Sequence, residues 1–313
     1  MTNEQPILTI AICTYNRSAM LEKVCNALFR QTVPIDQFCV LIVDNASTDG
    51  TKKYIEVIKK LFPHFYYIFE PIPGLSHARN AAWKNCHTPW IAYIDDDSKP
   101  EPRFVEALLK AIEGDNCDVI AGSIKPWCLY PLPSWFLSEY EEYIPSSQYG
   151  ALLSPSDFAY GGNIAIRRNW FEVVGGFNPD FGILGKVAPL GEETEFQRRI
   201  RAKGGRICFA PDAVVAHCAV PSKYTIAAQL RIRYRSGKST QILFDWRGWR
   251  ELGRLILKIP YRLGHAISTS VHRFAKGTYR WQNALIAVGG EACFLAGLFS
   301  GWLWLQQHKD WHL

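Results

Sequence analysis

The chain has 313 residues, 48% of them hydrophobic and 20% charged, and a formal net charge of +6 at pH 7. That length accommodates one large domain, or one domain with an appendage, around a sizeable core, and the lack of internal repeats excludes a repeat architecture. Nine cysteines are dispersed without a Cys-x-x-Cys pair, which argues against a disulfide framework or a zinc site and for a reducing cytosol.

Strand-like and helix-like segments alternate along the first 122 residues. Apolar runs predict buried strands at 7–13, 38–43, 65–69, 89–94 and 118–122. Helical spacing of apolar residues predicts helices near 18–31, 51–61, 75–86 and 101–113. This alternation predicts an α/β fold with a mostly parallel sheet covered by helices on both faces. In such sheets ligands bind beyond the carboxyl ends of the strands, where Tyr15, Asp44 and Asp95 to Asp97 all lie.

The predicted fourth strand ends in three consecutive carboxylates, Asp95, Asp96 and Asp97. Side chains alternate along an extended chain, so Asp95 and Asp97 are expected to point the same way. Two like charges about 4 Å apart repel by roughly 4 kcal/mol at an effective dielectric of about 20. A cation between them is therefore expected, and an all-oxygen site suits Mg²⁺ or Mn²⁺. The alternative is a solvated acidic turn before Ser98-Lys99-Pro100.

Four motifs follow one another in a characteristic order. They are Thr14-Tyr15-Asn16-Arg17, Asp44-Asn45-Ala46-Ser47-Thr48-Asp49-Gly50, Gly74-Leu75-Ser76-His77-Ala78-Arg79-Asn80 and Asp95-Asp96-Asp97. Their order and spacing resemble the inverting family 2 glycosyltransferases of GT-A fold, over about residues 7–218. The resemblance implies a metal-dependent enzyme that moves a sugar from a nucleotide-diphosphate donor, expected to be a UDP-sugar, to a hydroxyl of a glycan or lipid-linked acceptor. It also implies a place in bacterial polysaccharide or glycolipid synthesis.

The resemblance assigns several residues to the nucleotide-sugar donor. These are Thr14, Tyr15, Asn16, Arg17, Asp44, Arg79, Asp95, Asp96, Gly162 and Asn163. In the family, Asp44 would accept a hydrogen bond from a base N–H, with Tyr15 against the base. The same aspartate would also favour an Asx turn, and tyrosines at strand ends are often packing residues.

Arg79 and the Gly161-Gly162 pair each admit two interpretations. A cation early in a helix opposes the macrodipole unless it has an anionic partner, which for Arg79 is either the donor diphosphate or a surface salt bridge. Two glycines before a β-rich run permit close backbone approach to a ligand, and the resemblance places Gly162 and Asn163 beside the donor sugar. A plain turn is the alternative.

Residues 127–149 are rich in aromatic side chains and proline. Because sugars present apolar ring faces, an aromatic loop beside a cleft suits an acceptor site. An aromatic mini-core under a long loop explains the same composition equally well.

Glu192 and Glu193 lie in what resembles the family's second acidic motif, where the family usually has Glu-Asp. The resemblance assigns the general base to the second acid, Glu193, with Glu192 as the other candidate, since acids in a first helical turn are also ordinary dipole complements. His217 ends an apolar strand, and the resemblance makes it a metal or diphosphate ligand, together with Asp95 and Asp97. A lone histidine there is otherwise a hydrogen-bonded structural residue.

The C-terminal region differs in composition from the rest. Residues 229–280 carry a charge of +10, so the remaining residues sum to −4. Residues 249–263 predict a basic amphipathic helix, and 284–305 form an apolar run long enough to span a bilayer, with Glu291 as its one charge. Spanning and in-plane orientations both remain open, and the Gly297-to-Gly301 spacing suggests a helix contact. Basic residues before the run predict a catalytic domain on the cytoplasmic face.

The predicted organisation is a GT-A glycosyltransferase domain over residues 1–225 and a helical, membrane-associating region over 226–313. The basic stretch is not expected to bind nucleic acid, because no nucleic-acid motif accompanies it. A sugar nucleotidyltransferase can share the fold, but it typically has a Gly-rich phosphate loop after the first strand. A non-catalytic membrane partner is a third possibility, and the intact acidic motifs argue against it.

Overall fold

The computed structural model describes residues 5–60, 64–114, 116–146, 148–182, 190–244 and 248–308. Contacts within the chain divide it into two compact units. Unit 1 consists of Met1–Trp127, Glu141–Ala188 and Glu192–Cys218. Unit 2 consists of Cys128–Tyr140, Pro189–Gly191 and Ala219–Leu313.

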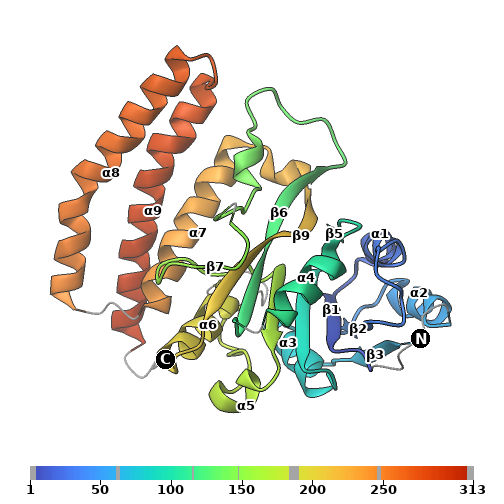
Figure 1. Ribbon diagram of the computed structural model, residues 1–313. Coiled ribbons are helices and arrows are strands. Elements are labelled where there is room, and N and C mark those ends of the chain that lie inside the picture. The colour runs from blue at the N-terminus through green and yellow to red at the C-terminus, as the bar shows by residue number, and fades with distance from the viewer. Residues whose placement is uncertain are drawn as a thin grey trace. The chain divides into compact units, whose positions relative to one another are not determined.

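Unit 1 is built on a nine-stranded sheet (Figure 1). One half is parallel, in the order β3-β2-β1-β4, with the bounds β1 Leu8–Thr14, β2 Cys39–Asp44, β3 Phe65–Phe69 and β4 Trp90–Asp95. The order continues β8-β6-β9-β5, and β7 also pairs with β9. These strands are β5 Ser98–Pro100, β6 Val119–Cys128, β7 Ala151–Leu152, β8 Asn163–Arg167 and β9 Ile207–Ala219. β8 runs antiparallel to both β4 and β6, so the sheet is mixed.

Helices cover both faces of this sheet, as the alternating pattern predicted. In β2, Val40 and Ile42 face one core cluster, while Leu41 and Val43 face the other. The first cluster packs against α1 Ser18–Leu28, α2 Thr51–Ile58 and α4 Phe104–Glu113. The second packs against α3 Leu75–Lys84, α5 Trp170–Val174 and α6 Glu192–Ala202. Because the central strands are buried on both faces, they had to be continuous apolar runs.

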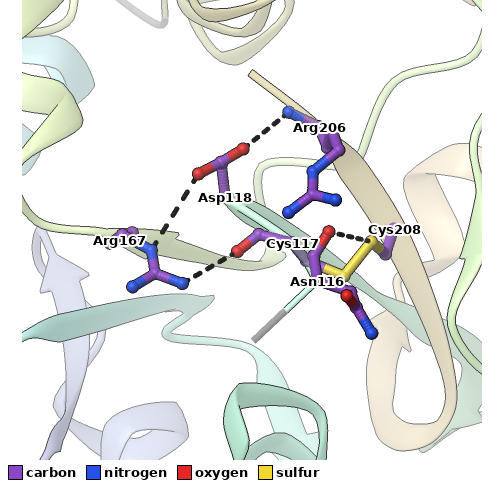
Figure 2. The surroundings of a disulfide bond; sticks show 6 residues. All are labelled: Asn116, Cys117, Asp118, Arg167, Arg206 and Cys208. Atoms are coloured by element: carbon purple, nitrogen blue, oxygen red, sulfur yellow. Dashed lines mark hydrogen bonds and ion pairs between the residues drawn. A yellow bond between two sulfur atoms is a disulfide. The ribbon is translucent and has the colours of Figure 1, made fainter. Parts of the chain in front are cut away.

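Unit 1 also contains a disulfide between Cys117 and Cys208 (Figure 2). The dispersed cysteines argued against a disulfide framework, and this pair departs from that expectation. Its cysteines are 91 residues apart in sequence, but β6 and β9 bring their Cα atoms to 5.7 Å, within the range that a disulfide requires. Beside it, Asp118 accepts a hydrogen bond from the Arg206 N–H at 2.8 Å and faces Arg167 Nε at 3.9 Å. The cysteines consequently no longer argue for a reducing compartment.

Unit 2 contains three long helices, α7 Ile226–Leu243, α8 Trp249–Ala275 and α9 Trp281–Gln307 (Figure 1). The predicted amphipathic helix lies within α8 and the predicted apolar run within α9. The helix α9 has 27 residues and contains an 18-residue window with a mean hydropathy of 1.6, so it is long and apolar enough to cross a membrane.

The aromatic stretch contributes a small core to unit 2, which confirms the mini-core interpretation for part of it. Phe136 packs against Tyr140 and Tyr224, with ring centroids 5.3 and 4.9 Å apart. Buried Asn283, at the start of α9, donates hydrogen bonds to the Trp135 carbonyl at 2.6 Å and to Tyr140 Oη at 2.9 Å.

Candidate active site

Three strands of unit 1 end side by side at the edge where the sequence placed the site. In register, Thr14 of β1 lies opposite Asp44 of β2, and Cys13 of β1 lies opposite Asp95 of β4. Because the three strands are parallel, the loops that follow them leave the sheet at the same edge. The predicted residues of these loops are therefore brought together.

Asp96 turns toward β1 and is held there. Its carboxylate accepts hydrogen bonds from Thr14 Oγ1 at 2.7 Å and from Arg17 Nη1 at 3.0 Å. Burial raises its pKa to about 6, although the Arg17 charge and the Thr14 hydrogen bond favour the ionised form. Asp96 is only 6% exposed, so this acid of the triplet is not solvated, whereas Asp95 and Asp97 are partly exposed.

Asp95, Asp97 and His217 form a cluster on which a metal could bind. One ligand atom from each lies within 4.8 Å of the other two. Antiparallel pairing of Ser98 with His217 brings β9 to this edge, and the Cys218 N–H donates to the Asp97 carbonyl at 2.9 Å. Burial raises the pKa of Asp95, and the nearby Asp97 charge raises it further. The two repelling carboxylates fit a divalent cation, and oxygen ligands suit Mg²⁺ or Mn²⁺.

The Asp44 side chain holds the loop after β2, but through a hydrogen bond from the N–H three residues on, and not through the Asx turn that was expected, which uses the N–H two residues on. Asp44 Oδ1 accepts a hydrogen bond from the Ser47 N–H at 2.9 Å, and Oδ2 accepts one from Tyr67 Oη at 3.2 Å. The residue is 1% exposed, so its carboxylate shapes the loop after β2. Its contact with a base remains a prediction.

The loop after β1 is linked to the loop after β2. Asn16 has a positive φ of 54°, and its side-chain oxygen accepts hydrogen bonds from the N–H groups of Thr48 at 2.7 Å and Asp49 at 3.2 Å. Tyr15 beside it is 56% exposed, so it is not a core-packing residue. A planar ligand could stack on it.

Arg79 is buried at the centre of the site. Its guanidinium forms an ion pair with Glu192, lies 3.6 Å from Asp95 Oδ1, and donates a hydrogen bond to the Gly161 carbonyl at 2.9 Å. The alternative of a salt bridge is thus confirmed, but this salt bridge is buried and not at the surface: the Arg79 side chain is 4% exposed. Arg79 connects an acid of the metal cluster to the second acidic motif, and its contact with a diphosphate stays a prediction.

The two glutamates of the second acidic motif lie in different surroundings. Glu192 is 4% exposed and ion-paired with Arg79. Glu193 is partly exposed and accepts a long hydrogen bond, 3.5 Å, from Thr194 Oγ1. Burial and the negative charge of Glu192 raise the pKa of Glu193 to about 8, with Arg79 opposing the rise. A carboxyl group that titrates near neutral pH is suited to accept a proton during a reaction.

Gly162 and Asn163 have structural partners within unit 1. A Cβ atom at Gly162 would lie 2.3 Å from Asp95 Oδ2, so glycine is needed for the approach of this backbone to the acid cluster. Asn163 is 1% exposed, and its amide donates hydrogen bonds to the carbonyls of Ser123 and Ala213, both at 2.8 Å. It joins β8 to β6 and β9, and its contact with the donor sugar remains a prediction.

Two residues near the cluster were missed by sequence reasoning, Glu141 and Tyr160. Glu141 Oε2 lies 3.5 Å from His217 Nδ1, and the Tyr160 ring packs edge-on against the His217 ring with centroids 6.4 Å apart. Both lie in irregular segments without a periodic pattern, so the sequence offered no signal for either.

Known proteins resemble this chain over most of its length. It is 26% identical over 233 residues to "Glycosyltransferase AglE" of Haloferax volcanii, and this alignment covers 74% of this chain and 73% of that protein. It is 24% identical over 316 residues to "Succinoglycan biosynthesis protein ExoM" of Rhizobium meliloti, covering 99% of this chain and 97% of that protein.

A solved structure shares the fold. The mannosyltransferase PcManGT of Pyrobaculum calidifontis, determined in complex with GDP-Man and Mn²⁺, superposes with a TM-score of 0.62 at 18% identity, covering 96% of this chain and 88% of that one. The sequence model described as Glycosyl transferase family 2 matches residues 9–175, which is more than half of the chain. The chain therefore belongs to glycosyltransferase family 2 and has the GT-A fold.

Proposed function

We propose that this glycosyltransferase moves a sugar from a nucleotide-diphosphate donor to a hydroxyl of a glycan or lipid-linked acceptor, with inversion at the anomeric carbon. The observation that carries the proposal is the pairing, in one site, of the Asp95, Asp97 and His217 cluster with a glutamate whose pKa is raised to about 8. The similarity to a succinoglycan biosynthesis protein supports a place in polysaccharide or glycolipid synthesis.

The reaction is a single displacement. The acceptor oxygen forms a bond to the anomeric carbon while the bond from that carbon to the donor phosphate oxygen breaks. Glu193 takes the proton of the acceptor hydroxyl, and the nucleoside diphosphate leaves with the bonding electron pair. Because attack and departure occur on opposite faces, the configuration inverts.

The acid cluster would hold a divalent cation through Asp95, Asp97 and His217. When bound, Mg²⁺ or Mn²⁺ neutralises negative charge on a diphosphate. A solved structure of the same fold that contains Mn²⁺ and a sugar nucleotide supports this assignment without choosing between the two metals. Arg79 holds the carboxylates of Asp95 and Glu192 in place, and so fixes the position of the acid cluster relative to the second acidic motif.

The donor nucleotide would lie over the loops that follow β1 and β2. Exposed Tyr15 offers a ring face to the base, while Asn16 holds the two loops together. Arg17 is half exposed and contacts both Asp96 and Asp97, so its guanidinium lies where a diphosphate would need positive charge. A UDP-sugar is the expected donor, and a GDP-sugar is the first competitor to test.

Residues 1–225 would then form the catalytic domain, and 226–313 the region that associates with the cytoplasmic face of a membrane. The +10 charge of residues 229–280 and the apolar helix α9 support this assignment, because basic residues near an anionic bilayer contribute about 1 kcal/mol each. A membrane location would bring the site to a lipid-linked acceptor.

The function is tested by incubating detergent-solubilised full-length protein with a panel of UDP- and GDP-sugars and measuring the nucleoside diphosphate released. One donor should be hydrolysed faster than the others, and chelator should suppress that rate. Proton NMR of the transferred sugar, once an acceptor is found, should show the inverted anomer. Retention would refute the single displacement, and undiminished turnover in excess chelator would refute the metal assignment.

A further inference from the structure

Helices α7 and α9 of unit 2 are in direct backbone contact. A Cβ atom at Gly237 of α7 would lie 2.0 Å from the Phe294 carbonyl oxygen of α9, and one at Gly297 would lie 2.1 Å from the Tyr234 carbonyl oxygen. A Cβ atom at Gly301 would meet α7 at 2.7 Å. The small-residue spacing of α9 thus serves a contact inside the chain, and the glycines fix α7 beside the middle of α9.

Because of this contact, α7 would have to enter a bilayer together with α9. If α9 spanned with Phe294 at the midplane, Gly237 would lie at the same depth. The cations of α7 are at most six residues away from it, which is about 9 Å along a helix and inside a hydrocarbon core about 30 Å thick. Charged side chains are strongly disfavoured in the hydrocarbon core of a bilayer. These cations are Arg231, Arg233, Arg235 and Lys238.

The outer faces of unit 2 carry the apolar surface that a bilayer interface accepts. On α9, Trp281, Leu285, Phe299 and Leu303 are 42–62% exposed, and their spacings of 4, 14 and 4 residues keep them on one face. Among the α8 side chains that the structure describes, the most exposed apolar ones are Leu257 at 81%, Tyr261 at 76% and Val271 at 65%. Large apolar side chains exposed in rows mark an interaction surface.

We propose that unit 2 lies in the plane of an anionic membrane surface, with the exposed apolar rows of α8 and α9 in the interface and with α9 not crossing the bilayer. Exposed cations, among them Arg231 and Lys258, supply the charge that complements anionic lipid. The inference rests on the proposed membrane association and adds its orientation.

Topology tests the orientation in cells. Full-length protein carrying a C-terminal green fluorescent protein should fluoresce, and the same chain carrying a C-terminal alkaline phosphatase should be inactive, because both ends of α9 remain on the cytoplasmic side. An active phosphatase fusion with a dark fluorescent fusion would show that α9 spans, and would overturn the proposal.

Vesicle binding tests the surface. Purified protein should co-sediment with vesicles containing 30% phosphatidylglycerol more than with pure phosphatidylcholine. The double variant Phe299→Glu and Leu303→Glu should bind to these vesicles at least about tenfold more weakly than wild type. The matched control is Val57→Glu, at a 60% exposed apolar position of α2 in unit 1, which should bind as wild type. If wild type ignores both vesicles, the membrane association itself fails; if wild type binds and the double variant binds equally, only the proposed surface fails.

A second inference concerns Glu141 and is independent of the membrane. The two ring nitrogens of His217 face different carboxylates: Nε2 lies 3.5 Å from Asp97 Oδ1, and Nδ1 lies 3.5 Å from Glu141 Oε2. The Glu141 side chain is 7% exposed. A buried carboxylate beside one imidazole nitrogen orients the ring and fixes which nitrogen carries the proton, so that the other is available to a metal.

We infer that Glu141 is a positioning residue for His217 in the proposed metal site. Because such supporting residues typically change metal affinity 10–100-fold, Glu141→Leu should weaken Mn²⁺ binding by that factor. Glu141→Gln, which keeps an acceptor oxygen but loses the charge, should fall between this variant and wild type. The control is Glu142→Gln, one residue along and exposed, which should bind Mn²⁺ as wild type.

Free Mn²⁺ measured by electron paramagnetic resonance gives these affinities without any turnover. A purely structural role for Glu141 would lower the melting temperature and leave Mn²⁺ affinity unchanged in the folded protein, and that result would refute the inference. If wild type itself binds no Mn²⁺, the metal site of the proposed function fails. If wild type binds and Glu141→Leu binds equally well, the inference about Glu141 fails alone.

Discussion

The pH dependence of turnover is the most direct test of which neighbouring glutamate, Glu192 or Glu193, acts as the general base. A general base acts only when deprotonated, so turnover should rise with pH through the pKa of Glu193, which is raised to about 8. With that pKa, only about 1% of the enzyme holds the carboxylate at pH 6, and kcat/KM should be ~100-fold below its plateau. A glutamate with an ordinary pKa near 4.5 would give almost full activity there.

Substitution of Glu193 and substitution of Glu192 should change the pH profile of turnover in different ways. Glu193→Gln should bind the sugar nucleotide normally, lose ~10²–10⁴ in rate and lose the pH dependence. Glu192→Gln removes a negative charge that raises the pKa of Glu193, so its profile should shift to lower pH with a smaller loss at the plateau. Initial rates of nucleoside diphosphate release from pH 5 to 9, at one fixed metal concentration, give all three profiles.

Protein stability provides an independent check on the same titration. A carboxyl group whose pKa is higher in the folded than in the unfolded chain binds more protons when folded, so the free energy of unfolding should fall as pH rises from about 4.5 to about 8. Glu193→Gln should abolish that contribution and melt at a higher temperature than wild type above pH 7. A flat wild-type rate profile, or an upward shift in Glu192→Gln, would refute the assignment of Glu193 as the base.

Three further outcomes are expected. Asp97→Asn should abolish chelator-sensitive turnover and weaken Mn²⁺ binding while the circular dichroism spectrum stays unchanged; full activity would exclude Asp97 as a ligand. Gly162→Ala should displace Asp95, because its Cβ would lie 2.3 Å from that carboxylate, and so weaken Mn²⁺ binding at an unchanged melting temperature. Asn283→Ala should lower the free energy of unfolding by about 1–3 kcal/mol, because Trp135 and Tyr140 lose a buried partner; thermal denaturation measures this, and an unchanged midpoint would contradict it.

Local patterns were sufficient to predict the parallel half of the sheet and its helices. Strands such as β2, buried on both faces, must be continuous apolar runs, and the acids that follow β4 lie at a strand end that the pattern itself identifies. The predicted alternation of Asp95 and Asp97 is confirmed by the cluster that they form with His217.

Contacts between distant segments could not be predicted in this way. The Cys117–Cys208 disulfide joins residues 91 apart, and the Arg79–Glu192 ion pair joins residues 113 apart. Glu141 reaches His217 from a loop without periodicity. In each case the partner is chosen by how strands and loops meet in space, which residue spacing along one segment does not encode.

The division between Glu192 and Glu193 shows how such a distant contact can determine chemistry. On helix α6 the two residues differ by one position, so each points about 100° from the other, and spacing alone does not separate their roles. Arg79 forms an ion pair with Glu192, which holds that carboxylate in place. Burial and the negative charge of Glu192 disfavour ionisation of Glu193 and raise its pKa, while the charge of Arg79 opposes the rise. Arg79 therefore acts on Glu193 in two ways, by holding Glu192 beside it and by its own positive charge. Replacing Arg79 should displace Glu192 and change the pH profile of turnover, and an unchanged profile would refute this role.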